Sequence, residues 1–190
     1  SWVIEQACRQ LAIWTESEQA LQLKLSVNIS ARQFHQENFL PQVIQTLERY
    51  GVARNRLQFE LTESILVSRV DEVVAKMNLL KNYGVAFALD DFGTGYSSLS
   101  YLKRLPLEQL KIDRSFVDDI LNDPNDAAIA STVIALSSAL GLGVIAEGVE
   151  TAAQRDALAA LGCYHYQGFY FSRPLPGQDF VAMQQQAQLH

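Results

Sequence analysis

Short apolar segments that each end in a polar residue recur along this chain of 190 residues. The segment from Val85 to Leu89 leads directly to two adjacent carboxylates, Asp90 and Asp91. Five further segments of this kind end at Asn28, Glu60, Lys111, Glu147 and Gln167. Helical periodicity separates them and predicts helices over 2–14, 39–50, 69–83, 126–140 and 152–161. Apolar strands that alternate with helices are typical of a parallel sheet covered by helices, so the sequence predicts an α/β fold with six such strands.

The polar strand ends favour a barrel over a doubly wound sheet. All six lie on the carboxyl side of their strands, where a (β/α)8 barrel assembles its active site. A doubly wound sheet draws ligands from fewer strands and usually has a glycine-rich loop after the first one, which this sequence lacks. Barrels of this type need roughly 250 residues. We therefore expect a TIM-like (β/α)8 barrel that is N-terminally incomplete, with about six of its eight strands in residues 1–190.

The composition limits the classes of partner. A net charge of −6 without a run of Lys or Arg argues against binding to polymeric nucleic acid. Cys8 and Cys163 lie in apolar periodic segments, which predicts buried free thiols and a cytoplasmic location. No apolar stretch of about 18 residues occurs, so no membrane segment is expected. With 48% hydrophobic residues, we expect residues 1–190 to form a single domain.

The acidic strand ends predict a metal site. Adjacent carboxylates raise each other's pKa unless a cation lies between them. Carboxylate and amide oxygens are the ligands that Mg²⁺ or Mn²⁺ prefers, whereas zinc sites usually contain His or Cys. The alternative is that each acid caps a helix or faces solvent. The oxygen donors that the pattern brings to one edge are Asn28, Glu60, Asp90, Asp91 and Glu147.

Lys111 is expected to point into the same mouth as these acids. A lysine there can orient the attacking water or stabilise charge that develops on a phosphate. The alternative is a structural ion pair with Asp113 or Glu147. For Glu63, the simplest interpretation is that it lies in the first turn of a helix. The tripeptide from Asp91 to Gly93 matches the magnesium-binding tripeptide of protein kinases, but the other kinase motifs are absent.

Six segments together resemble the signatures of the EAL domain, the bacterial phosphodiesterase that linearises cyclic di-GMP to 5′-pGpG. They are Val27 to Ser30, Glu60 to Glu63, Asp90 to Leu99, Leu110 to Asp113, Ala146 to Glu150 and Gln167 to Pro174. They occur in the family's order and cover essentially the whole chain. The resemblance implies a metal-dependent hydrolase with two Mg²⁺ or Mn²⁺ ions and a small cyclic dinucleotide as substrate.

The resemblance also implies a role for each matching position. The metal ligands would be Asn28, Glu60, Asp90, Asp91 and Glu147; the catalytic residues Glu147, Lys111 and Asp91; and the substrate-binding residues Glu150, Gln167 and Pro174. Glu63 would anchor the loop from Phe92 to Ser100, which in this family couples metal binding to the contacts of a homodimer. A catalytically inactive cyclic di-GMP receptor is the alternative function, and an inert scaffold fragment is a third.

The Glu-Ala-Leu motif that names the family, and the arginine that follows it, do not occur in these 190 residues. The resemblance places both before Ser1, where the glutamate would be a further metal ligand and the arginine a phosphate contact. We therefore expect the chain to be the C-terminal part of a larger signalling protein with an upstream sensor or GGDEF-type domain. Residues 1–190 alone are expected to be inactive.

Overall fold

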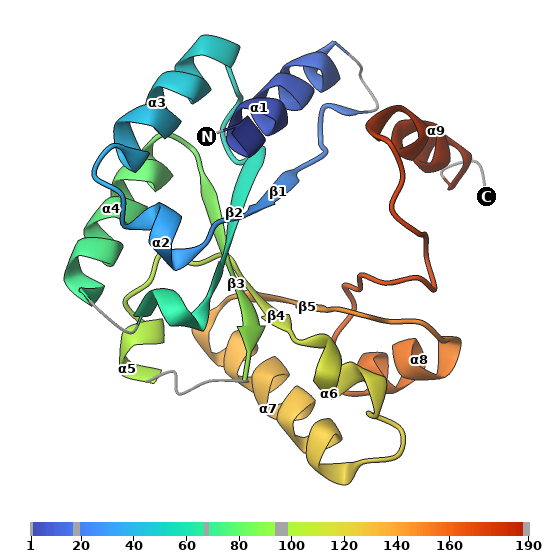
Figure 1. Ribbon diagram of the computed structural model, residues 1–190. Helices are drawn as coiled ribbons and strands as arrows, with labels where there is room; N and C mark the ends of the chain where they lie inside the picture. The colour runs from blue at the N-terminus through green and yellow to red at the C-terminus, as the bar shows by residue number, and fades with distance from the viewer. Residues whose placement is uncertain (1, 17–19, 67–68, 94–98, 188–190) are drawn as a thin grey trace.

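The computed structural model of the protein describes residues 2–16, 20–66, 69–93 and 99–187. Five strands form one parallel sheet in the order β1-β2-β3-β4-β5 (Figure 1). They are β1 (Leu25–Asn28), β2 (Leu57–Thr62), β3 (Ala86–Phe92), β4 (Gln109–Ile112) and β5 (Gly143–Ala146). Each strand pairs with the next one in the chain, which is the arrangement that connections through helices produce in a barrel wall.

Helices occupy the connections between all five strands. The longer ones are α1 (Trp2–Thr15), α3 (Phe39–Tyr50), α4 (Val70–Asn82), α7 (Pro124–Leu140) and α8 (Ala152–Ala160), and these confirm the five predicted helices. Three short helices were not predicted: α2 (Ala31–Phe34), α5 (Leu99–Leu102) and α6 (Arg114–Asp118). The 3₁₀ helix η2 (Glu63–Leu66) is the helical turn that the sequence offered as the alternative for Glu63. The last helix, α9 (Gly177–Ala187), was not predicted either.

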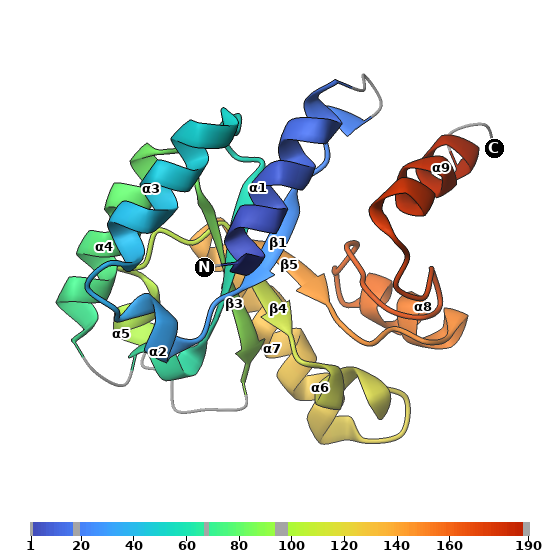
Figure 2. The ribbon, with the colours of Figure 1, turned by 45° about the horizontal axis from the view of Figure 1, so that its top comes forward.

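The two faces of the sheet differ in chemistry because successive strand residues alternate between them. The outer face carries buried apolar side chains, and Phe59 contacts both Phe39 of α3 and Phe87 of β3 at ring-centroid distances of 6.0 and 6.1 Å. Helices α3, α4 and α7 lie along this outer side (Figures 1 and 2). The inner face carries Glu60, Lys111 and the other polar strand ends. Because the apolar outer face packs against the helices, these polar side chains all lie on the inner face.

Glycines end two of the main helices. Gly51 after α3 and Gly141 after α7 adopt left-handed conformations, with φ of 59° and 69°. Residues with a Cβ rarely adopt this region, whereas glycine enters it at little cost. Each glycine therefore stops its helix and turns the chain toward the next strand.

The predicted sixth strand, over 164–166, is wrong in extent. Only one isolated parallel bridge forms there, between Ala146 and Tyr166. The main chain of Gln167 then donates to Ala146 and accepts from Val149, at 2.8 and 3.0 Å. Glycines at 162 and 168 bracket this short run, and the chain turns at both, so it has room for one bridge and no ladder.

The C-terminal helix α9 returns to the start of the chain. Phe180 of α9 lies against Trp14 of α1, with ring centroids 6.5 Å apart. Gly177 at the start of α9 lies beside the side chain of Gln10. The start of α9 therefore contacts α1, although these are the last and first helices that the structure describes.

Within the described residues, no helix is both long and apolar enough to span a membrane.

Replacing Gly168 with alanine is expected to destabilise the protein. A Cβ at this position would overlap the backbone of Val149, which cannot move aside as a flexible side chain can. Overpacking of this kind typically costs about 1–3 kcal/mol. Gly143→Ala is the matched control, because a Cβ there meets its nearest neighbour, the carbonyl oxygen of Glu108, at an ordinary 3.4 Å. Equal midpoints for the two variants in urea denaturation would contradict the close approach at Gly168.

Candidate active site

A buried lysine joins three carboxylates at the carboxyl edge of the sheet. The Nζ atom of Lys111 lies 2.7 Å from Glu60 Oε2, 3.1 Å from Asp90 Oδ1 and 2.5 Å from Glu147 Oε1. Only 3% of Lys111 is exposed, and Glu60 and Asp90 are buried as well. The predicted convergence of these strand ends is therefore confirmed in the geometry.

Neighbouring strands supply these residues in register. Asn28 of β1 is the register partner of Glu60 in β2. In β4, Lys111 pairs with Ile145 of β5, and Glu147 follows two residues later on the same face. Asn28 is exposed on the edge strand, whereas Glu60 is buried on the second one. The parallel register thus places an amide and a carboxylate side by side at the end of β1 and β2.

A distortion of β3 turns both aspartates toward one site. In a regular strand, Asp90 and Asp91 would point to opposite faces. The pairing of β3 with β4 shifts register between Leu89 and Phe92, and Asp91 has a left-handed backbone with φ of 54°. Aspartate tolerates this conformation better than most residues. As a result, Asp90, Asp91 and Glu147 each bring one carboxylate oxygen within 4.8 Å of the others.

The cluster holds more negative than positive charge. Burial raises the pKa of Glu147, and the carboxylates of Asp90 and Glu60 add to that shift against the opposing effect of Lys111. Burial alone would lower the pKa of Lys111, but its hydrogen bonds to Glu147 and Glu60 outweigh burial and raise it. One lysine therefore faces the four carboxylates of Glu60, Asp90, Asp91 and Glu147, an imbalance that favours binding of a further cation.

Asp113 contacts this cluster through Asp91. Burial, the charges of Asp90 and Asp113, and a hydrogen bond with Asp113 raise the pKa of Asp91. Burial would also raise the pKa of Asp113, but hydrogen bonds from the side chain and main chain of Ser115 lower it. Among the described residues Lys111 forms no ion pair with Asp113, so of the two structural pairs considered for this lysine only the one with Glu147 is present.

The donor set fits a hard divalent cation. Asp90, Asp91 and Glu147 form the one group of three or more His, Cys, Asp or Glu ligands that the described part of the chain brings together. All of its ligand atoms are carboxylate oxygens, as Mg²⁺ and Mn²⁺ prefer and as structural zinc sites usually are not. Glu60 and Asn28 lie beside this group and could add oxygen ligands.

A pocket of about 210 Å³ adjoins the cluster. Its lining consists of Arg114, Glu147, Gly148, Glu150, Gln167, Gly168 and Phe169. Two of the predicted substrate residues, Glu150 and Gln167, therefore lie in this lining, whereas Pro174 does not. Arg114 and Phe169 were not among the predicted site residues. They follow the predicted strand ends Lys111 and Gln167 by three and two residues, and this closeness was the signal that could have found them.

The predicted loop anchor makes a contact of the expected kind. The Oε1 atom of Glu63, in η2, accepts a hydrogen bond of 3.0 Å from the main chain of Gly93. The Oε2 atom of the same side chain is buried and has no hydrogen-bond partner within the described ranges. Residues 94–98 of the loop that Glu63 was predicted to anchor lie outside the described residues. The contact holds the start of that loop against the end of β2.

The fold and site define an α/β barrel-type protein with an acidic, oxygen-only cluster at the carboxyl edge of its strands. The family model of the EAL domain matches residues 1–174, and the chain belongs to this family. The bifunctional diguanylate cyclase/cyclic di-GMP phosphodiesterase MucR of Pseudomonas aeruginosa is 42% identical over 181 residues, which cover 95% of this chain and 26% of MucR. The chain spans about a quarter of the length of the curated relatives it matches.

Solved structures confirm the predicted fold class. A cyclic di-GMP complex of the PaMucR phosphodiesterase matches with a TM-score of 0.89 and 42% identity, over 94% of this chain and 72% of that one. A manganese and cyclic di-GMP complex of Klebsiella pneumoniae BlrP1 matches with a TM-score of 0.78 and 29% identity, over 92% of this chain and 44% of that one. The relatives of this chain thus include cyclic di-GMP phosphodiesterases.

Proposed function

We propose that the protein hydrolyses cyclic di-GMP to linear 5′-pGpG in a reaction that depends on divalent metal ions. The observation that carries this proposal is the cluster around Lys111, where four carboxylates from three strands meet beside a pocket. The relatives named as cyclic di-GMP phosphodiesterases support the choice of substrate. The manganese complex of BlrP1 supports the choice of metal.

Mg²⁺ or Mn²⁺, with two ions expected, would be held by Asn28, Glu60, Asp90, Asp91 and Glu147. When bound, such ions polarise a phosphate and lower the pKa of water. The oxygen-only donor set and its excess of negative charge fit these ions. The bulge in β3, which brings carboxylate oxygens of Asp91 and Asp90 close together, supports including Asp91 in this set.

Lys111 and Glu147 are the side chains proposed to act on the reacting groups. The ammonium group of Lys111 is buried and has a raised pKa, so it stays protonated and can stabilise charge that develops on the phosphate. Glu147 lies 2.5 Å from this ammonium group and also lines the pocket. The raised pKa of Glu147 brings it closer to neutral pH, which suits a carboxylate that accepts a proton from the attacking water.

The pocket beyond Glu147 is the proposed place for the rest of the dinucleotide. Glu150 and Gln167 line it and offer hydrogen-bonding groups to the substrate. Phe169 adds an aromatic ring, and aromatic rings stack on nucleobases. Pro174, which lies outside the lining, is proposed to contact the substrate only at the mouth of the pocket.

We further propose that the chain is the C-terminal part of a longer cytoplasmic signalling protein, whose preceding segment supplies the remaining strands and the Glu-Ala-Leu motif. The share of MucR that the chain matches supports this proposal. Two buried free thiols, Cys8 and Cys163, suit a reducing compartment. A homodimer through the loop after Asp91 and an upstream sensor or GGDEF-type domain complete the proposal.

The test is hydrolysis of cyclic di-GMP by the longer protein that contains this chain. We expect turnover in Mg²⁺ or Mn²⁺, none in EDTA, and 5′-pGpG as the product on ion-exchange chromatography. Tight binding of cyclic di-GMP without turnover in either metal would replace the proposed enzyme with a receptor. If the longer protein neither binds nor hydrolyses cyclic di-GMP, the proposed substrate is wrong as well.

Metal binding is expected to raise the melting temperature. An ion at about 100 times its Kd that binds only the folded state stabilises that state by about 2.7 kcal/mol. For a domain of about 150–250 residues, this corresponds to roughly 5–10 °C. Asp90→Asn should lose most of the increment, whereas Asp123→Asn, at the start of α7, should keep it. A wild-type melting temperature that is the same in Mn²⁺ and in EDTA would contradict the metal site.

A further inference from the structure

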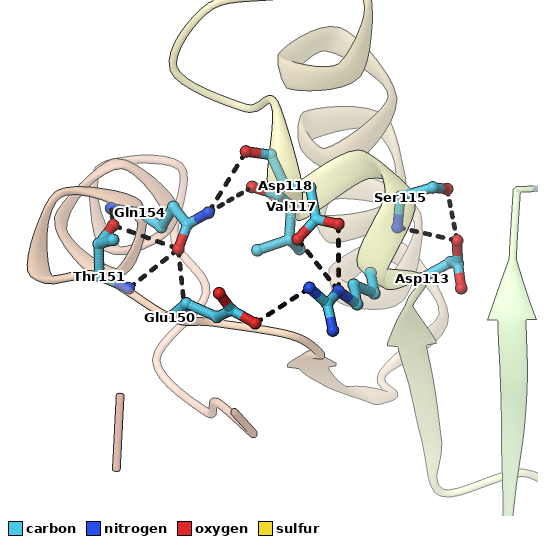
Figure 3. Close-up of polar contacts among 8 residues, drawn as sticks. Asp113, Ser115, Val117, Asp118, Glu150, Thr151 and Gln154 are labelled. Carbon is cyan, nitrogen blue, oxygen red and sulfur yellow. Dashed lines mark hydrogen bonds and ion pairs between the residues drawn. The ribbon is translucent and has the colours of Figure 1, made fainter. Parts of the chain in front are cut away.

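Gln154 connects two loops that both contribute residues to the lining of the pocket. It is the third residue of α8, and only 7% of it is exposed. One of these loops runs from Glu147 to Thr151, after β5. The other includes α6, after β4, and begins beside Lys111. Figure 3 shows the side-chain amide of Gln154 between them, with hydrogen bonds to both.

The oxygen of the Gln154 amide binds the first loop. Oε1 accepts hydrogen bonds from the main chain of Glu150 and Thr151, at 2.9 and 3.0 Å. It also accepts one from Thr151 Oγ1, which in turn accepts from the main chain of Gln154 at 3.2 Å. This arrangement is a capping box, in which either Gln or Glu serves at the third position.

The nitrogen of the same amide binds the second loop. A capping box does not require this contact. Nε2 donates to the main-chain carbonyls of Val117 and Asp118, at 3.2 and 3.3 Å. These carbonyls are at the C-terminal end of α6, where a helix leaves acceptors without partners of its own. A glutamate could form the cap but could not donate here, so glutamine is required only for the link between the loops.

Arg114 forms a second link between the same two loops, at the pocket itself. Its guanidinium group lies 3.1 Å from Asp118 of α6 and 3.0 Å from Glu150 of the other loop. Its aliphatic stem lies against Gly148, where a Cβ would overlap Arg114 Cγ. Arg114, Gly148 and Glu150 all line the pocket. The separation of the two loops therefore sets the width of the pocket.

We propose that Gln154 is a positioning residue that fixes the width of the dinucleotide pocket by holding α6 to the loop from Glu147 to Thr151. The proposal rests on the proposed function for the identity of the substrate. Gln154 does not line the pocket and acts through Arg114 and Glu150. Loss of the Nε2 hydrogen bonds widens the pocket, while the cluster around Lys111 stays held by its strands.

Gln154→Glu tests this assignment, because it keeps the cap and places a carboxylate oxygen against two carbonyls. In the longer protein, we expect KM for cyclic di-GMP to rise about tenfold. Losing one or two hydrogen bonds between the loops lowers the population of the arrangement that binds substrate by about that factor. The kcat value should stay within about threefold, because the cluster around Lys111 is held by its strands. A rise in KM at nearly constant kcat reports lost binding rather than lost chemistry. Thr151→Ala is the matched control, because it removes the cap hydroxyl and leaves Nε2 in place. Its melting temperature should fall while its KM stays that of the wild type.

Hydrogen exchange of the main-chain amides provides a measurement that does not depend on the substrate. Amides of residues 114–118 should exchange faster in Gln154→Glu and at the wild-type rate in Thr151→Ala. An active wild type with unchanged KM and exchange in Gln154→Glu would overturn the role of Gln154 and leave the proposed function intact. Equal increases of KM in both variants would assign the effect to the cap and overturn it too. If the wild type is inactive on cyclic di-GMP, the proposed function fails. In that case, unchanged amide hydrogen exchange of residues 114–118 in Gln154→Glu would still overturn the link between the loops.

Discussion

Replacing Lys111 with methionine is expected to lower the free energy of unfolding in EDTA by about 3–5 kcal/mol, the usual cost of removing one partner from a buried ion pair. Lys111 contacts Glu60, Asp90 and Glu147, and its removal leaves three carboxylates facing one another. Methionine has a similar length and fills the same space without the charge. Urea denaturation in EDTA measures the change.

The pH dependence of this variant separates lost charge from lost packing. Lys111 opposes the effect of burial on the pKa of Glu147, so its removal raises that pKa further in the folded state. The folded variant then binds a proton more tightly than the unfolded chain does. Stability relative to the wild type should therefore rise as the pH falls from about 7 to about 5.

Lys24→Met is the matched control for Lys111→Met. Lys24 pairs with Glu108 at 3.3 Å, but its side chain is half exposed. Pairs of this kind contribute about 0–1 kcal/mol, so the control should unfold close to the wild type. Equal unfolding free energies for Lys111→Met and Lys24→Met at pH 7 would show that the charge of Lys111 does not hold the cluster together.

Glu147→Gln is expected to lower kcat for cyclic di-GMP hydrolysis at least about a hundredfold, the lower end of what general acid or base catalysis contributes. The amide has nearly the same shape as the carboxylate but cannot accept a proton or hold a cation as strongly. Binding of cyclic di-GMP should largely survive, because Glu150 and Gln167 still line the pocket. Steady-state kinetics and calorimetry on the longer protein measure the two effects separately.

Glu108→Gln provides the comparison for Glu147→Gln. Glu108 is a carboxylate paired with a lysine, but it precedes β4 and lies at the amino end of the sheet. Its replacement should leave kcat unchanged. A Glu147→Gln variant that turns over as fast as Glu108→Gln would remove Glu147 from the proposed chemistry.

The strands and the convergence of their ends were predictable because both follow from local pattern. Alternation of apolar and polar residues places Glu60 and Lys111 on the inner face, and a parallel sheet brings their ends to one edge. The same pattern over-predicted the segment at 164–166. Its residues resemble a strand, but the turns at Gly162 and Gly168 leave only the bridge at Tyr166.

The details of the site depend on contacts that no local pattern encodes. The bulge in β3 lets Asp90 and Asp91 act together, yet the sequence carries only an Asp-Asp pair before a glycine-bearing turn. Similarly, Gln154 follows Val117 and Asp118 by more than 30 residues, and their contact depends on how α8 packs beside α6. Periodicity places residues on a face, whereas tertiary packing sets which residues touch.

The most direct test of the account is the position of Mn²⁺ in crystals of the longer protein grown with MnCl₂. Manganese can be identified by its anomalous scattering, independently of any assumption about ligands. We predict strong anomalous peaks coordinated by carboxylate oxygens of Asp90, Asp91 and Glu147, within reach of Glu60 and Asn28. The contradicting result would be crystals, grown with millimolar MnCl₂, in which Mn²⁺ is bound elsewhere and the ammonium group of Lys111 is the only cation in the cluster.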